Sequence, residues 1–236
     1  MPDPVVFLPG MMCDARLFWP QVTALSPTRA VQVAPLTGAA SMGPLAAKVL
    51  DHAPRRFVLA GLSMGGIVAM EILRRAPDRV TRVVLMDTNP LPETPQRAAA
   101  REPQIIGART GRLEEILRDE MKPSYLAPGP ARSEVLHLVV DMGLHLGGEV
   151  FVDQSRALQR RVDQQATLRA CKVPALILCG EHDTLCPVER HEVMAGLMQD
   201  AQLEVIPDAG HLPVLEQPER VNRILMNWLD SPLLLQ

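Results

Sequence analysis

The chain has 236 residues, of which 47% are hydrophobic and 22% charged, a composition typical of a globular protein and not of a disordered or fibrous one. The formal net charge of −3 makes nucleic acid and anionic membranes poor candidates as partners, and no apolar run is long enough to predict a membrane span. There is no signal-peptide pattern at the N-terminus, and the four cysteines show no metal-site spacing, so we expect a cytoplasmic protein with reduced thiols.

Short apolar runs alternate with stretches of helical periodicity along the chain. Each run is almost continuously apolar, which is typical of strands that are buried on both faces of a parallel sheet. The runs that we predict as strands are 5–8, 31–33, 57–60, 83–86, 175–179 and 203–206.

The segments between these strands predict helices. Ser41 can cap a helix over 42–50, and the segment 64–75 is apolar on nearly all sides, which predicts a deeply buried helix. Residues 221–229 carry apolar side chains at the spacing of an amphipathic helix. This order of elements predicts an α/β fold with about six mostly parallel strands flanked by helices.

One long interval, between Asp87 and Val173, contains no convincing strand. It carries several helical patterns of apolar residues, and a structureless loop of this length would be unusual in a compact protein. We therefore predict a helical cap over residues 89–170, which is inserted into a core domain made of residues 1–88 and 171–236.

The segment Gly61-Leu62-Ser63-Met64-Gly65 joins the predicted strand 57–60 to the buried helix. This is a G-x-S-x-G pattern in a strand–turn–helix context. Side chains two positions before or after Ser63 would clash in so sharp a turn, which holds the serine hydroxyl above the edge of the sheet. The pattern predicts a serine nucleophile, with a glycine-rich turn of no catalytic role as the alternative.

A serine hydroxyl needs a general base, and the base needs a group that orients it. Of the six histidines, His211 follows the last predicted strand, and Asp183 follows the strand 175–179. Ser63, Asp183 and His211 would then lie beyond the carboxyl ends of three strands, where open α/β sheets place their sites. Their order along the chain is the one expected for this elbow geometry.

Four segments resemble the α/β-hydrolase superfamily, and the resemblance covers nearly the whole chain. Leu8-Pro9-Gly10 resembles the entry to the oxyanion loop, Gly61–Gly66 the nucleophile elbow, and Gly180–Asp183 the end of the acid strand. Gly210-His211 with Glu216–Glu219 resembles the histidine loop and the last helix. The chain looks like the capped carboxylesterases typified by pimeloyl-acyl-carrier-protein methyl ester carboxylesterase. It departs from the family in having Pro9 where His is common, and in lacking a leading antiparallel hairpin.

The resemblance implies further site residues. The oxyanion hole needs two backbone N–H groups, which we assign to Met64 and Met11, with Met12 as the neighbouring candidate for the second donor. The Met12 side chain is also a candidate to line the acyl pocket. Asp87, at the end of the strand 83–86, is an alternative acid to Asp183.

The predicted cap also offers pocket residues, for which ordinary packing or a solvated helix face is the alternative. Arg156 could act as an anion clamp. The other candidates are Tyr125, His137, His145 and Phe151.

We therefore expect a serine hydrolase that cleaves the ester of a small or medium-chain acyl group, free or carrier-bound, through a Ser-His-Asp triad and an acyl-enzyme. The mechanism requires no metal and no cofactor. One alternative is a C–C bond hydrolase or a menaquinone-pathway type of lyase with the same triad. Another is a ligand-binding scaffold without catalysis. We expect no nucleic-acid or membrane partner, and the oligomeric state is left open.

Overall fold

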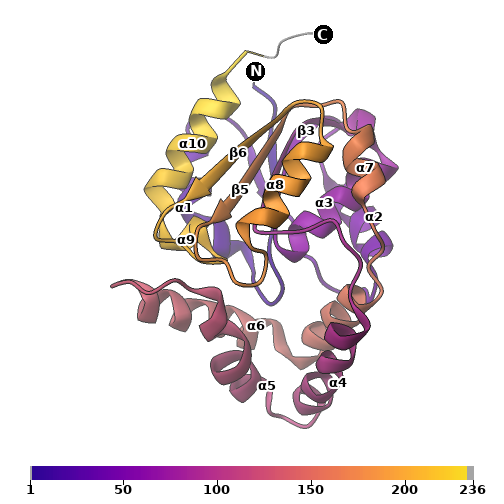
Figure 1. The fold of residues 1–236 in the computed structure, drawn as a ribbon, viewed down its shortest axis with the longest axis vertical. Helices are drawn as coiled ribbons and strands as arrows, with labels where there is room; N and C mark the ends of the chain where they lie inside the picture. Colours follow the sequence, from indigo (N-terminus) through magenta and orange to yellow (C-terminus); the bar gives the residue numbers. More distant parts are fainter. Residues whose placement is uncertain (1, 233–236) are drawn as a thin grey trace.

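The computed structural model describes residues 2–232, in which six strands form one sheet (Figure 1). The strand order is β2-β1-β3-β4-β5-β6, and every neighbouring pair is parallel. The predicted parallel α/β sheet of about six strands is therefore confirmed. The strands are β1 (Val5–Leu8), β2 (Val31–Val33), β3 (Phe57–Leu62), β4 (Val80–Met86), β5 (Ala175–Gly180) and β6 (Ala201–Ile206).

Alternating side chains of each strand enter two apolar cores, one on each face of the sheet. Val6 and Leu8 pack in one core, whereas Val5 and Phe7 pack in the other. Burial of each such side chain contributes about 1.5–3 kcal/mol to stability. The sheet therefore forms the middle layer of three and holds the carboxyl ends of its strands in fixed positions.

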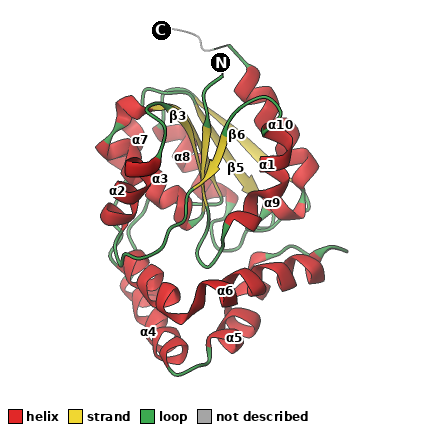
Figure 2. Ribbon diagram, turned by 180° about the vertical axis from the view of Figure 1, so that it is seen from behind, coloured by secondary structure: helices red, strands yellow, loops and turns green. Residues whose placement is uncertain are grey.

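Helices cover both faces of the sheet (Figure 2). The first core is covered by α2 (Met42–His52), α3 (Met64–Arg75) and α8 (Val188–Leu197), and the second by α1 (Trp19–Leu25) and α10 (Pro218–Asp230). Shorter elements complete these layers: the 3-10 helices η1 (Ala15–Phe18) and η2 (Pro77–Arg79), and the helix α9 (Pro213–Glu216).

Most of residues 89–170, which we call the insert, lies at the end of the sheet where β5 and β6 terminate, whereas its last helix, residues 165–170, packs against α3 and α8 (Figures 1 and 2). The described part of the insert is helical and contains no strand. Its elements are α4 (Pro95–Arg109), α5 (Leu113–Glu115), η3 (Ile116–Met121), η4 (Lys122–Tyr125), α6 (Arg132–Gln159) and α7 (Gln165–Ala170).

By length and composition alone, α6 is apolar enough to cross a membrane. Gly147 interrupts it, however, with a φ of 82° that glycine adopts without strain, so α6 consists of two shorter helical pieces. Val139, Met142 and Phe151 of α6 are buried in the protein, as in a helix that packs on a core. The cytoplasmic location stays a prediction.

Candidate active site

Ser63 lies on the turn between β3 and α3, in the positive-φ region with φ 54° and ψ −116°. The two flanking glycines are required sterically. A Cβ on Gly61 would lie 2.4 Å from the carbonyl oxygen of Gly65, and one on Gly65 would lie 2.0 Å from that of Leu8. Ser63 N–H donates to the Met86 carbonyl at 2.9 Å. The strained turn is thus anchored to β4, and the hydroxyl is left at the edge of the sheet.

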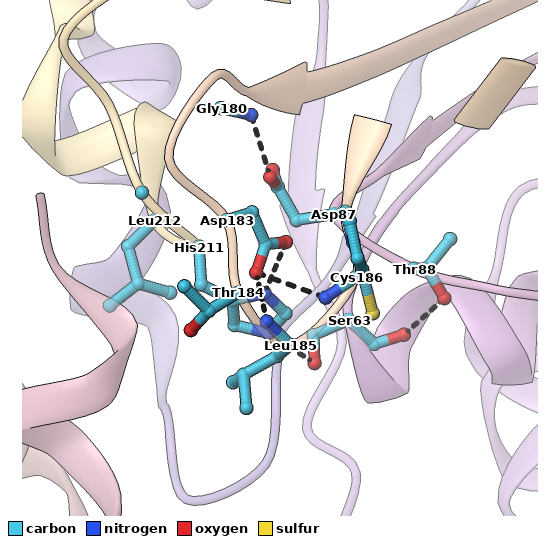
Figure 3. A network of polar contacts seen from close by, with 12 residues as sticks. Ser63, Asp87, Thr88, Gly180, Asp183, Thr184, Leu185, Cys186, His211 and Leu212 are labelled. Carbon is cyan, nitrogen blue, oxygen red and sulfur yellow. Dashed lines mark hydrogen bonds and ion pairs between the residues drawn. The ribbon is translucent and has the colours of Figure 1, made fainter. Parts of the chain in front are cut away.

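The Ser63 hydroxyl, the His211 ring and the Asp183 carboxylate form one hydrogen-bonded chain (Figure 3). His211 Nε2 lies 2.8 Å from Ser63 Oγ, and Nδ1 lies 2.7 Å from Asp183 Oδ2. The tautomer with its proton on Nδ1 donates to Asp183 and leaves Nε2 free to accept the serine proton. His211 and Asp183 are only 2% and 4% exposed, so water is largely excluded from the hydrogen bond between them.

Asp183 is held as an anion in this buried place. Burial alone would raise its pKa, but the attraction of His211 and the N–H groups of Cys186 and Leu185 outweigh burial and lower the pKa. Both N–H groups donate to Oδ1, at 3.0 Å and 2.8 Å, so Oδ2 is oriented toward His211.

Asp87, the alternative acid, lies at the end of β4 and contacts a different group. Its Oδ1 accepts from the Gly180 N–H at 2.9 Å, and its Oδ2 has no hydrogen-bond partner within residues 2–232. Burial and the neighbouring charge of Asp183 raise the pKa of Asp87 well above its usual value. Both effects disfavour the charged form of Asp87, and Asp183, which is the carboxylate in contact with His211, is the better candidate to stabilise a charged imidazole.

The loop that carries His211 is held from both sides. Glu216 accepts hydrogen bonds from the N–H groups of Gly210 and Leu212, both at 3.0 Å, and from Ala127 of the insert at 2.7 Å. Tyr125, also from the insert, accepts the His211 backbone N–H at 2.6 Å, and its ring packs edge-on against the imidazole. The insert therefore contributes directly to the orientation of this histidine.

The loop after β1 brings Met11 beside Ser63. Throughout the described residues 2–232, the N–H groups of Met11 and Met64 meet no acceptor, whereas the Met12 N–H donates to Gln154 Oε1 at 2.8 Å. Two free donors at the nucleophile suit an oxyanion. Lys122, which is fully buried, donates to the Met11 carbonyl at 3.1 Å and so helps to hold the peptide that joins Met11 to Met12.

A pocket of about 120 Å³ opens onto the Ser63 hydroxyl. Of the predicted residues, it is lined by Ser63, His211, Met11 and Tyr125. The remaining lining comes mostly from the insert and from the ends of β4 and β5: Ile67, Thr88, Asn89, Glu93, Arg97, Arg101, Leu158, Arg161, Leu185 and Cys186.

Several predicted substrate residues lie elsewhere. Met12 and Phe151 are fully buried in the apolar core, and His145 is exposed on α6. Arg156, predicted as an anion clamp, binds Glu102 on α4 because both side chains project between these two helices. His137 lines a separate hollow beside Leu215. These five residues are not among those that line the pocket at Ser63.

Asp183, Cys186 and His211 are the described residues that come close enough together to hold a metal ion, with ligand atoms within 4.8 Å of one another. Metal ligation requires the thiolate form of cysteine. Burial and the charge of Asp183 raise the pKa of the Cys186 thiol to about 12, and both Asp183 oxygens already accept hydrogen bonds. The cluster thus suits proton transfer better than metal binding.

A larger hollow of about 710 Å³ lies near the amino ends of β3, β4 and β5. Its lining includes Arg56, Arg74, Asp78 and Lys172, and none of the residues around Ser63. The candidate catalytic side chains Ser63 and His211 therefore line the smaller pocket, at the opposite end of these strands.

The chain is similar to several known proteins over most of its length. A model described as the alpha/beta hydrolase family matches residues 5–224. A pimeloyl-[acyl-carrier protein] methyl ester esterase of Aromatoleum aromaticum is 30% identical over 187 residues, which cover 72% of this chain and 73% of that protein. The carboxylesterase YbfK of Bacillus subtilis is 31% identical over 189 residues, which cover 72% of this chain and 56% of that protein.

Solved structures give a similar result. A thermophilic esterase from Thermogutta terrifontis, with malate bound, has a TM-score of 0.87 and 31% identity, over 96% of this chain and 89% of that one. The enol-lactonase from Burkholderia xenovorans LB400 has the same TM-score of 0.87 over 98% of this chain and 92% of that one. Its identity is 24%, so this second likeness concerns the fold alone.

Proposed function

Because the chain belongs to the alpha/beta hydrolase family, we propose that this hydrolase cleaves carboxylic esters with Ser63 as nucleophile, His211 as base and Asp183 as the carboxylate that orients the imidazole. The observation that carries the proposal is the position of the His211 ring, 2.8 Å from the Ser63 hydroxyl and 2.7 Å from the Asp183 carboxylate. Similarity to named esterases supports ester bonds as the target.

The reaction then proceeds in two halves. Ser63 Oγ attacks the ester carbonyl carbon while His211 Nε2 takes the hydroxyl proton, and the Met11 and Met64 N–H groups stabilise the oxyanion. His211 returns the proton to the leaving alcohol, which leaves an acyl group on Ser63. Water, deprotonated by His211, attacks the carbonyl carbon of this acyl-enzyme. The bond between that carbon and Ser63 Oγ breaks, His211 returns the proton to Ser63 Oγ, and the carboxylic acid is released.

We further propose that residues 89–170 act as a cap on a core made of residues 1–88 and 171–236. Tyr125 and Leu158 of the insert line the pocket, and the Tyr125 carbonyl accepts the His211 N–H. These contacts support a cap that shapes the site and limits the entry of water. The small pocket favours short and medium acyl chains.

A panel of esters from acetyl to decanoyl tests the function, with Ser63→Ala as the blank and a methyl ester on an acyl carrier as one arm. We expect wild-type turnover of at least one short or medium-chain ester, and a loss of kcat of about a thousandfold or more in the variant. Near-wild-type turnover by Ser63→Ala would contradict the mechanism. Stronger turnover of a vinylogous diketone or a succinylated cyclohexene acid than of any ester would favour C–C cleavage or elimination.

A further inference from the structure

Three arginines of the insert line the pocket that opens onto the Ser63 hydroxyl. Arg97 and Arg101 belong to α4, and Arg161 follows α6. Arg97 is exposed, whereas the Arg161 side chain is only 7% exposed. We call these three residues the arginine rim.

The rim carries more positive charge than its surroundings neutralise. Glu93 is the one carboxylate among the lining residues, and both of its oxygens are already bound. Oε2 accepts from Arg101 Nη2 at 2.9 Å, and Oε1 accepts from Arg161 Nη2 at 3.2 Å. Three guanidinium groups against one carboxylate leave a formal excess of two positive charges at the entrance to the nucleophile.

Several guanidinium donors of the rim remain available. Within residues 2–232, the Arg97 side chain donates no hydrogen bond, and neither does Nη1 of Arg161. Arg101 Nη1 meets only the Met11 sulfur, at 3.8 Å, which is a weak acceptor. Burial and the neighbouring charges of Arg101 and Arg97 lower the pKa of Arg161, although Glu93 opposes the shift. An anion in the pocket would relieve this repulsion and occupy the free donors.

We propose that the arginine rim is an anion subsite, and that the substrate is an ester with a carboxylate a short apolar distance from its carbonyl group. A guanidinium fork matches the two oxygens of a carboxylate. Ile67, Leu158 and Leu185 supply apolar walls to the same pocket, which suit a short hydrocarbon chain. This inference rests on the proposed ester hydrolysis and names the substrate class of that same site.

The carboxylate could belong to the acyl part or to the alcohol part of the ester, and paired substrates distinguish the two. Monomethyl esters of the dicarboxylic acids from succinate to pimelate are compared with their neutral dimethyl esters. Acetyl esters of hydroxy acids are compared with their methyl esters. We expect kcat/KM to be about tenfold higher for the charged member in one series. Raised ionic strength should increase KM for the charged member only.

The matched variants are Arg97→Gln, Arg97→Glu and, as a control at the exposed far end of α4, Arg109→Gln. Because Arg97 is exposed and has no side-chain partner, its replacement should leave folding intact. We expect Arg97→Gln to lower kcat/KM for the charged ester about fivefold, and Arg97→Glu to lower it further. The neutral ester should lose less kcat/KM than the charged ester in both Arg97 variants, and Arg109→Gln should change neither ester by more than about twofold.

The outcomes separate this inference from the proposed function. Hydrolysis of neutral esters that depends on Ser63, with equal kcat/KM for charged and neutral members, would overturn the anion subsite and leave the esterase intact. Failure to hydrolyse any ester would contradict the proposed function, and calorimetric binding of free glutarate then tests the rim by itself. Binding to the wild type that is lost in Arg97→Glu supports the subsite, and no binding to the wild type overturns it.

Discussion

The core and the insert contact the loop after β1 in different ways. On the core side, the loop follows directly after β1, and the side chains of β1 are all buried among apolar neighbours. From the insert, two buried polar side chains reach the loop: Lys122 donates to the Met11 carbonyl, and Gln154 accepts the Met12 N–H while donating to the Leu36 carbonyl at 2.8 Å.

This difference separates stability from the geometry of the site. Apolar burial in the sheet stabilises the fold without requiring exact atomic positions, whereas the hydrogen bonds to the Met11 carbonyl and the Met12 N–H fix the plane of the peptide that joins these two residues. We therefore expect substitutions in the core to change the free energy of unfolding, and substitutions at the polar contacts of the insert to change catalysis more than stability.

The largest expected effect is that of Ser63→Ala on turnover. We expect kcat to fall about a thousandfold or more, while the free energy of unfolding changes by less than about 1 kcal/mol. Ester kinetics and thermal unfolding measure the two. Ser155→Ala is the matched control, because the buried Ser155 hydroxyl has no hydrogen-bond partner in the described residues. This variant should retain full activity. A severe loss of stability in Ser63→Ala would contradict the expectation that this residue affects catalysis and not stability.

The next effect concerns the pH dependence of stability in the core. His191 is fully buried, where Thr88 donates its N–H to the ring Nε2 at 3.1 Å, and burial lowers the pKa of His191 to about 4. The unfolded chain binds this proton at higher pH than the folded one does. The stability should therefore fall by about 3 kcal/mol as the pH drops from about 6.5 to about 4.

Denaturant titrations at several pH values measure this loss of stability. The contribution of residue 191 is isolated by comparing His191→Gln with His182→Gln, a control at an exposed position. We expect the acid-induced loss to shrink in His191→Gln alone. Equal pH dependence in both variants would contradict the assignment.

A smaller effect, confined to catalysis, is expected for Lys122→Met. The variant removes the hydrogen bond to the Met11 carbonyl, so the loop that carries the Met11 N–H should be held less firmly near the oxyanion, and kcat should fall about tenfold. Removal of a buried ammonium that has no carboxylate partner in the described structure should leave stability equal or raise it.

KM for a neutral ester should stay within about twofold of the wild-type value in Lys122→Met. Lys172→Met is the control, because Lys172 is exposed. If kcat and stability fell together in Lys122→Met, the polar contacts of the insert would stabilise the fold as the core does. The expected difference between the insert and the core would then be wrong.

The smallest effect is expected for Arg156→Gln, at the surface between two helices of the insert. Its ion pair with Glu102 is partly exposed, and such pairs contribute little to stability. We expect an unchanged unfolding midpoint and unchanged KM for charged esters, in contrast to Arg97→Gln. A raised KM would return Arg156 to the pocket, as the sequence first suggested.

The sheet and the three residues at its carboxyl edge were predictable from sequence because their signals are local. Ser63 lies between glycines that only a tight turn requires, and Asp183 and His211 directly follow apolar strands. The arginine rim has no such signal. Arginine is frequent along the whole chain, and only the packing of α4 against α6 decides that Arg161 reaches the pocket while Arg156 binds Glu102.

The reactivity of the Ser63 hydroxyl is tested most directly with a fluorophosphonate and mass spectrometry of the intact protein. We expect a single adduct on Ser63, formed as fluoride leaves and His211 accepts the proton, and much slower labelling in His211→Gln. A folded wild-type protein that shows no adduct at Ser63 after prolonged exposure would contradict the assignment of Ser63 as an activated nucleophile.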